Sequence, residues 1–242
     1  MGAFDNLTND GLERQGDSLG SGRQVFPSDI YDMKIKYAYA GKSSGGAMSV
    51  TVVGNLLTAN NAEYSETFYI TNKQGQNFFE KNDKKIPLPG FTVIDDMCCF
   101  GDKKHLSQQS TEDKIIEKYD AEAKGMVQVS VPVITGLTNK TVTVAIRQIK
   151  EYKRKKFDDG YKTIADTIEI NQIDKVFDNT THKTANEMID KKETAEFYNT
   201  WLKANKSIIK DKTKGKLPEV TETSDSSSSS SAPSTPAVDP FA

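Results

Sequence analysis

Histidine and cysteine are scarce in this chain, with two of each among its 242 residues. His105 and His182 lie far apart in polar segments, and in the sequence neither has a second ligand at the spacing of a metal site. Cys98 and Cys99 are adjacent, and adjacent cysteines rarely reach disulfide geometry, so we expect a reducing compartment. This shortage argues against an enzyme, and we expect no catalytic residue, no metal and no cofactor.

Long apolar runs are also missing, since no stretch approaches the roughly 20 apolar residues that cross a membrane. Residues 1–22 are polar and rich in glycine, so we expect no secretory signal. Residues 41–46 contain Gly-Lys-Ser, but their order is not that of a phosphate-binding loop, and a strand pattern follows them. The side chains of the carboxylate pair at 95–96 would point in different directions on a helix. The pair at 158–159 belongs to an Asp-Gly turn. None of these segments favours catalysis.

The chain has a formal net charge of −2, but the charge is unevenly distributed. Four of the 34 acidic residues lie in a C-terminal segment dominated by serine, proline and threonine, so the remainder has 32 basic and 30 acidic residues. We therefore divide the chain into a flexible N-terminal arm (1–27), a folded domain (28–216) and a disordered, acidic, Ser-rich tail (217–242).

Alternation of apolar and polar residues with a period of two predicts β-strands through most of residues 28–173. Three are expected at 31–39, 48–56 and 64–71, and later ones at 115–119, 126–134, 142–156 and 161–173. In the first strand one face should carry Tyr31, Met33, Ile35, Tyr37 and Tyr39. A meander with a short helix between strands 3 and 4 has the order of an OB fold, so we predict a mainly β, OB-fold-like small barrel with a C-terminal helix. Another small barrel, or a β-sandwich with an added helix, are the alternatives.

The sequence also predicts two helices, one within the strand pattern and one after it. The first is expected near 92–100, where Thr92 and Asp95 form a capping pair and Gly101 follows the end. The second should begin at the capping box of Thr184 and Glu187 and dock on the sheet. Apolar stripes at helical spacing should face the core, with Ile94, Met97 and Cys98 in the first helix and Phe197, Tyr198, Trp201 and Leu202 in the second.

Positive charge is concentrated in residues 147–156, where six of ten residues are basic. A charged hairpin tip is most often a solvated surface. Here, however, other cations lie on the first strand and in the neighbouring turns, and aromatic residues are interleaved with them. A single strand of nucleic acid needs this combination, because cations follow phosphates while flat rings stack on bases, at roughly 1 to 3 kcal/mol per base. The predicted DNA-binding set is Lys34, Lys36, Lys42, Tyr69, Lys73, Phe79, Arg147, Lys150, Tyr152, Lys153, Arg154, Lys155 and Lys156.

The C-terminus carries a second candidate site. Asp239, Pro240 and Phe241 follow a Ser/Pro-rich tether and precede Ala242. A frayed end is the common interpretation of such a segment. An apolar anchor behind an acid and a proline is nevertheless typical of a docking peptide, so we predict that these three residues bind a partner protein.

Four stretches, residues 31–49, 68–77, 86–96 (Ile-Pro-Leu-Pro-Gly-Phe-Thr-Val-Ile-Asp-Asp) and 171–177, together with the acid-and-phenylalanine terminus, resemble the single-stranded DNA-binding proteins of tailed bacteriophages. The resemblance implies an OB-fold body that coats single-stranded DNA in replication or recombination, self-associates on it, and recruits replication or recombination proteins through its tail. It also implies the cytoplasm of an infected bacterium. The terminus departs from the bacterial ending Asp-Ile-Pro-Phe, because the isoleucine is missing and Ala242 follows Phe241.

Two other functions compete with this one, and neither involves a membrane. A virion structural or assembly protein would use the exposed strands for protein contacts and would not bind nucleic acid. An inhibitor that mimics DNA with acidic side chains is disfavoured, because the acidic residues do not cluster in the folded domain. Sequence-independent binding of single-stranded DNA is therefore the functional hypothesis.

Overall fold

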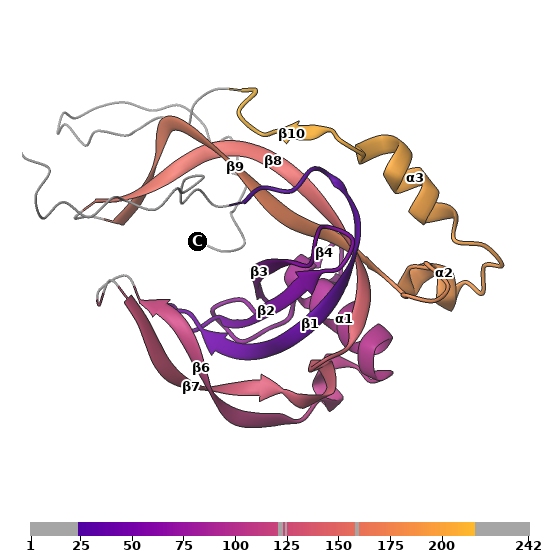
Figure 1. Ribbon diagram of the computed structural model, residues 1–242, viewed down its shortest axis with the longest axis horizontal. Helices are drawn as coiled ribbons and strands as arrows, with labels where there is room; N and C mark the ends of the chain where they lie inside the picture. Colours follow the sequence, from indigo (N-terminus) through magenta and orange to yellow (C-terminus); the bar gives the residue numbers. More distant parts are fainter. Residues whose placement is uncertain (1–23, 121–122, 124, 158–159, 216–242) are drawn as a thin grey trace, which may run out of the picture.

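Three antiparallel strands joined by short turns form the centre of the computed structural model, which describes residues 24–120, 123, 125–157 and 160–215 (Figure 1). They are β1 (Asp29–Lys42), β2 (Met48–Leu56) and β3 (Ala62–Tyr69), in this order across the sheet. One face of the three strands, including Met33, Val52 and Phe68, is buried in the main core. The predicted meander is therefore present, and the described chain is mainly β.

Two long hairpins extend this sheet. β8 (Thr141–Phe157) pairs with β9 (Gly160–Phe177), and β6 (Thr111–Asp120) pairs with β7 (Gly125–Ile134). β1 joins them, because residues 29–34 pair with β8 while Tyr39 pairs with Val133 of β7. Both hairpins project toward the left of Figure 1. The short helical turns η1 (Leu106–Gln108) and η2 (Thr135–Leu137) precede β6 and follow β7.

The sheet does not close into a barrel, so the predicted barrel is not what the described strands form. β3 pairs with β2 and β9 pairs with β8, but β3 and β9 do not pair with each other. A side chain links them instead, since the Glu66 carboxylate of β3 accepts a hydrogen bond of 2.8 Å from the backbone N–H of Ile173. The helix α1 (Pro89–Asp102) packs against both strands. Gly90 permits this approach, because a Cβ atom there would clash with the carbonyl of Tyr69.

Helix α1 follows a small hairpin of β4 (Phe78–Lys81) and β5 (Lys84–Pro87). Its predicted core residues are confirmed, since Ile94, Met97 and Cys98 are all fully buried. The predicted ends are wrong. The helix begins at Pro89, because the fixed φ of proline suits the first turn, and it ends where Lys103 adopts a left-handed conformation with φ 58°. Thr92 and Gly101 both lie inside it.

The C-terminal helical region consists of α2 (Ala185–Ile189) and α3 (Glu196–Asn205) rather than one helix. The predicted capping box is confirmed: the Glu187 N–H donates to Thr184 Oγ1 at 3.2 Å, and the Thr184 N–H donates to Glu187 Oε2 at 2.9 Å. α3 docks on the sheet as predicted, with Trp201 buried against Ala145 and Phe177. Among the described residues no helix is long and apolar enough to span a membrane.

The folded body extends further at its start than the predicted boundary at residue 28. Phe26 is buried in the main core, and its N–H and C=O both bond the side-chain amide of Asn171, each at 2.7 Å. After α3, the strand β10 (Ile209–Asp211) pairs in parallel with β8 and was not predicted. Residues 1–23 of the arm and 216–242 with the docking peptide lie outside the described residues.

Candidate nucleic-acid interface

A β-bulge in β1 reverses the direction of its two tyrosines. The pairing with β2 shifts by one residue between Ile35 and Tyr37, which places Lys36 in the bulge. After this shift Ala38 faces the core and is fully buried. Tyr37 and Tyr39 consequently lie on the outer face, half-buried, with ring centroids 6.3 Å apart. The prediction that they share the face of Ile35 is wrong.

The outer face of β1, β2 and β3 carries tyrosines separated by small hydroxyl side chains. Tyr39 is opposite Thr51, which is opposite Thr67, and the two threonine hydroxyls are 2.8 Å apart. Tyr69 is opposite Ser49 on the same face and is 39% exposed. Because paired residues of antiparallel strands share a face, these tyrosines belong to one surface. We refer to Tyr37, Tyr39 and Tyr69 as the tyrosine face.

Two of the predicted cations lie beside the tyrosine face. Lys34 and Lys36 are exposed on β1, and Lys36 Nζ lies 2.5 Å from Glu63 Oε2. The hydrogen bond that Lys36 donates to Glu63 raises the pKa of Lys36, which stays charged at neutral pH. Since both members of this pair are about half exposed, the pair itself adds little to stability. A phosphate group can therefore replace Glu63 as the partner of Lys36 at small cost.

The β6–β7 hairpin adds a lysine that the sequence analysis missed. Val133 pairs with Tyr39, and Lys114 pairs with Val131, two residues earlier on β7, so Lys114 lies on the same face as Tyr39. Lys36, Tyr37 and Lys114 line one cavity of about 520 Å³ between β1 and this hairpin. Lys114 stands directly before the predicted strand 115–119, and this position was the available signal.

Lys42 and Lys73 meet at the β1–β2 turn. A Cβ atom on Gly45 would lie 3.3 Å from Cε of Lys73, and one on Gly46 would lie 4.0 Å from Cε of Lys42. Both lysines are exposed. Lys42 is opposite Met48. The Met48 carbonyl accepts a hydrogen bond of 2.9 Å from the N–H of Ile70, the residue after Tyr69. The structure thus brings Lys42, Lys73 and Tyr69 to one end of the meander.

Phe79 lies beside the same end. It is 40% exposed and is opposite Ile86, which lines a cavity of about 650 Å³ together with Tyr69. The cavity lies between β3, β9 and α1, and its polar walls include Asp96 and Lys175. Burial raises the pKa of Asp96 to about 6, although Lys175 opposes the shift. Tyr69 therefore lines a hollow with both apolar and charged walls, and Phe79 is paired with Ile86 at its edge.

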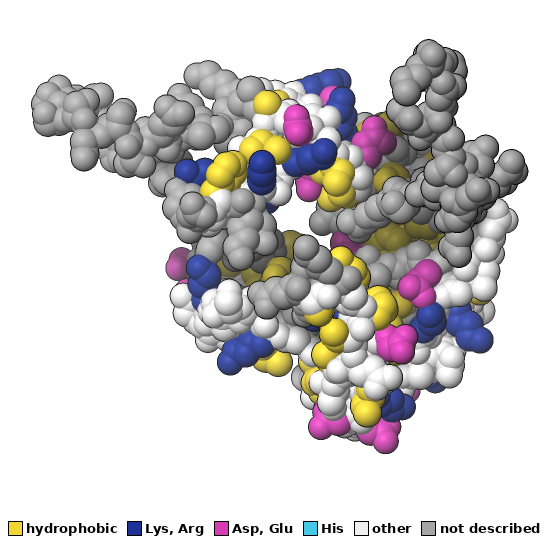
Figure 2. All heavy atoms as spheres, turned by 60° about the vertical axis from the view of Figure 1, so that its left-hand side comes forward, with side chains coloured by type: hydrophobic (Ala, Val, Ile, Leu, Met, Phe, Trp, Pro, Cys, Tyr) yellow, Lys and Arg dark blue, Asp and Glu magenta, His cyan; other side chains and the backbone are white. Residues whose placement is uncertain are grey.

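The β8–β9 hairpin presents a separate group of cations. Lys153, Arg154 and Lys155 are exposed, and the ammonium groups of Lys155 and Lys162 lie 5.8 Å and 5.7 Å from the Phe157 ring centroid. The side chain of Lys156 lies outside the described residues. Figure 2, which turns the left side of Figure 1 forward, shows Lys and Arg side chains among acidic and apolar ones on the upper part of the molecule, above a hollow in the surface.

Three members of the predicted set contact other parts of the protein. Arg147 forms an ion pair of 2.9 Å with Asp174, with its side chain 23% exposed. The hydroxyl of Tyr152 donates to the carbonyl of Thr213 at 3.1 Å, and Lys150 is opposite Glu169. These partners arrive from β9 and from the segment after β10, so spacing along β8 alone did not reveal them. We leave Arg147, Lys150 and Tyr152 out of the interface.

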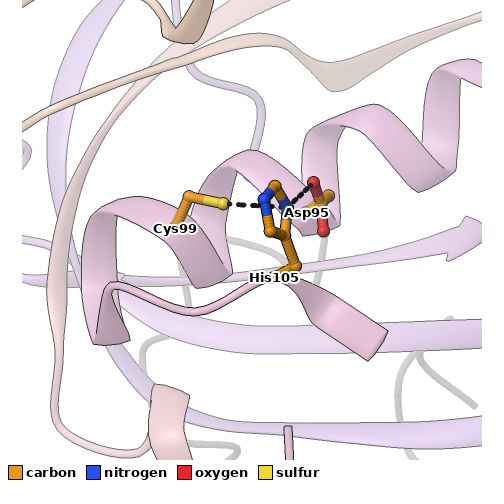
Figure 3. Close-up of side chains that lie close together, drawn as sticks. All are labelled: Asp95, Cys99 and His105. Carbon is orange, nitrogen blue, oxygen red and sulfur yellow. Dashed lines mark hydrogen bonds and ion pairs between the residues drawn. The ribbon is translucent and has the colours of Figure 1, made fainter. Parts of the chain in front are cut away.

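The structure places two potential metal ligands beside His105, which their spacing in the sequence did not reveal. His105 Nδ1 lies 2.9 Å from Asp95 Oδ2 and 3.5 Å from Cys99 Sγ (Figure 3). Burial raises the pKa of Cys99 to about 11, and Asp95 adds to the effect. Burial likewise raises the pKa of Cys98 to about 12. Both groups are therefore protonated at neutral pH and are poor nucleophiles as they stand.

Comparison of the chain with protein-family models, with curated proteins and with solved structures found no match. The function is therefore inferred from the residues and their geometry.

Proposed function

We propose that the protein binds single-stranded DNA without sequence preference. The observation that carries this proposal is the bulge in β1, because it places Tyr37 and Tyr39 on the outer face with Tyr69 and beside Lys36 and Lys114. Rings on a sheet surface stack on bases of any identity, and lysines beside them neutralise phosphates. Lys42 and Lys73 lie at the β1–β2 turn, at the end of this surface. Lys153, Arg154 and Lys155 on the β8–β9 hairpin are a separate cationic group that would bind further phosphates.

We further propose that the fold is an open variant of the OB fold. A three-stranded meander, then a helix, then a hairpin whose first strand pairs with β1 is the chain order of that fold. The hairpins β4–β5 and β6–β7 are insertions on either side of α1. In OB folds the face of the central strands and the loops beside it bind single strands, and the tyrosine face has this position.

The resemblance to phage single-stranded DNA-binding proteins makes this proposal specific. The protein would coat DNA during phage replication or recombination in the host cytoplasm and recruit partner proteins through Asp239, Pro240 and Phe241. The acidic tail would compete with DNA for the cationic surface. Deletion of residues 218–242 should then tighten DNA binding and abolish recruitment, whereas unchanged affinity would remove the competition.

Titration of fluorescent oligo-dT at several salt concentrations tests the proposal. Binding should be tight, equal for oligo-dT and a mixed sequence, and weaker for a duplex of the same length. The logarithm of affinity should fall with the logarithm of salt by about 0.7 for each phosphate contacted. Absence of binding at low salt would refute the proposal.

A pair of matched variants then locates the surface. Lys153→Ala with Arg154→Ala removes two exposed charges of the β8–β9 hairpin and should reduce the salt slope by up to about 1.4. Lys191→Ala with Lys203→Ala removes two exposed charges near α2 and α3, which lie at the right of Figure 1 while the hairpin tip lies at the left. The control variant should keep the wild-type slope.

One observation favours the alternative function, a virion assembly protein. Ile115, Tyr119 and Met126 of the β6–β7 hairpin are 72%, 62% and 61% exposed, and exposed apolar side chains in one hairpin are typical of protein contacts. That function predicts no affinity for oligo-dT and a concentration-dependent increase in mass by light scattering. The same preparation thus separates the two functions.

A further inference from the structure

Helix α1 and the loop after it bring three different metal-ligating side chains together. Asp95 and Cys99 are one helical turn apart, so they share a face of α1. The helix ends where Lys103 turns left-handed and donates its N–H to the Cys99 carbonyl at 3.1 Å. This turn reverses the chain and returns His105 to the same face (Figure 3).

Hydrogen bonds hold the Asp95 carboxylate and the backbone of His105 in place. The Leu106 N–H donates to Asp95 Oδ1 at 2.7 Å, and the His105 N–H donates to Gln108 Oε1 at 3.0 Å. Because the first bond uses one carboxylate oxygen, the other, Oδ2, faces the His105 ring. Fixed orientation of this kind is what outer-shell hydrogen bonds supply in metal sites.

The ligand atoms have the spacing of a tetrahedral site. His105 Nδ1 is 2.9 Å from Asp95 Oδ2 and 3.5 Å from Cys99 Sγ, and the three atoms all lie within 4.8 Å of one another. Zinc bonds of about 2.3 Å to sulfur and about 2.0–2.1 Å to nitrogen and oxygen give ligand separations of about 3.3 to 3.6 Å. Small side-chain rotations suffice to reach them.

We propose that Asp95, Cys99 and His105 bind a zinc ion, with water as the fourth ligand. One sulfur, one imidazole nitrogen and one carboxylate oxygen form a donor set that zinc accepts, whereas magnesium and calcium require oxygen ligands. The His105 side chain is 66% exposed, so the ion and its water have access from solvent.

A cluster held only by hydrogen bonds is the competing explanation. The ring nitrogen Nδ1 has a single position for a proton or a bond in the ring plane, yet it faces both Oδ2 and Sγ. A proton on Nδ1 can form a good hydrogen bond with only one of these two atoms at a time. A metal ion at that position would bond Nδ1, Oδ2 and Sγ together. The ion would join the loop before β6 to α1, and it is independent of the proposed DNA binding.

Titration of the full-length chain with Co²⁺, followed by displacement with Zn²⁺, tests the site. Wild type should bind a single equivalent with visible bands of tetrahedral cobalt and a sulfur-to-cobalt absorption, and Zn²⁺ should abolish both and raise the melting temperature. Cys99→Ser should lose the sulfur absorption. His105→Ala, which alters an exposed side chain, should lose the tetrahedral bands while remaining folded.

Matched controls come from the only other cysteine and histidine in the sequence. Cys98→Ala and His182→Ala should keep the wild-type spectrum, because Cys98 faces the core and the His182 ring stacks on Tyr198. The proposal is overturned if wild type shows no sulfur-to-cobalt absorption, or if that absorption survives in Cys99→Ser and disappears in Cys98→Ala.

Discussion

Arg147 of β8 and Asp174 of β9 form an ion pair whose nitrogen–oxygen distance is 2.9 Å. The same carboxylate oxygen, Oδ2, accepts a hydrogen bond of 2.6 Å from the indole of Trp201, and the Arg147 guanidinium lies 6.0 Å from the indole ring centroid. These contacts fasten α3 to the outer side of the β8–β9 hairpin. Arg147 therefore belongs to the packing of the C-terminal helix, although it begins the most basic segment of the sequence.

Substitution of Arg147 should consequently affect stability more than DNA binding. Arg147→Met leaves a partly buried carboxylate without its cation, so the free energy of unfolding should fall by about 1–3 kcal/mol. Affinity for oligo-dT should stay within about twofold of wild type and the salt slope should not change. Urea unfolding and fluorescence titration measure the two effects. A reduced salt slope with unchanged stability would return Arg147 to the interface.

The strands were predictable because each has one face in the core, and burial imposes the period of two. The bulge in β1 was not predictable from the sequence, because it arises where the strand stops pairing with β8 and begins to pair with β7. No local residue pattern indicates such a change of partner strand. Gly54 was a weak indication of a close backbone approach at the bulge. A Cβ atom there would lie 2.7 Å from the carbonyl oxygen of Lys34, just before the bulge. One shifted residue decided which tyrosines reach solvent.

The same limit applies to the side-chain clusters. Arg147 and Trp201 are far apart in the sequence, and only the docking of α3 shows that the arginine is engaged. His105 approaches Cys99 because Lys103 adopts a left-handed conformation, which lysine seldom does and which no residue pattern predicted. Sequence patterns identified exposed cations such as Lys42 and Lys155 well, because solvent exposure requires no partner.

The tyrosine face should contribute through ring stacking rather than through hydroxyl groups. Tyr37→Leu removes a ring that lines the cavity shared by Lys36 and Lys114, so affinity for oligo-dT should fall by about 1–3 kcal/mol for each base unstacked. Tyr37→Phe should keep most of the affinity. Tyr119→Leu, which alters an exposed tyrosine at the β6–β7 tip, serves as the control. Equal losses in the Leu and Phe variants of Tyr37 would contradict stacking.

Asp96 should make stability depend on pH. Burial raises its pKa to about 6, whereas an unfolded aspartate has a pKa of about 3.9, so the folded state binds more protons between these values. Stability then falls as pH rises through that window. Asp96→Asn should therefore be more stable than wild type at neutral pH, by at most about 3 kcal/mol, and equally stable below the unfolded pKa. Thermal unfolding across this range measures the difference, and a destabilised variant at neutral pH would count against the assignment.

Glu66 should hold the unpaired edges of β3 and β9 together. Its Oε2 atom accepts from the backbone N–H of Ile173 at 2.8 Å and from the hydroxyl of Tyr64 at 2.7 Å. Glu66→Ala leaves both donors without this acceptor, so the free energy of unfolding should fall by about 1–3 kcal/mol, whereas Glu66→Gln keeps an acceptor oxygen and should lose less. Hydrogen exchange at the Ile173 amide should accelerate in the Ala variant more than exchange at Ile149, an amide position in the paired interior of β8. Equal acceleration at both amides would mean that the variant weakens the whole sheet. Glu66 would then not be a local link between β3 and β9.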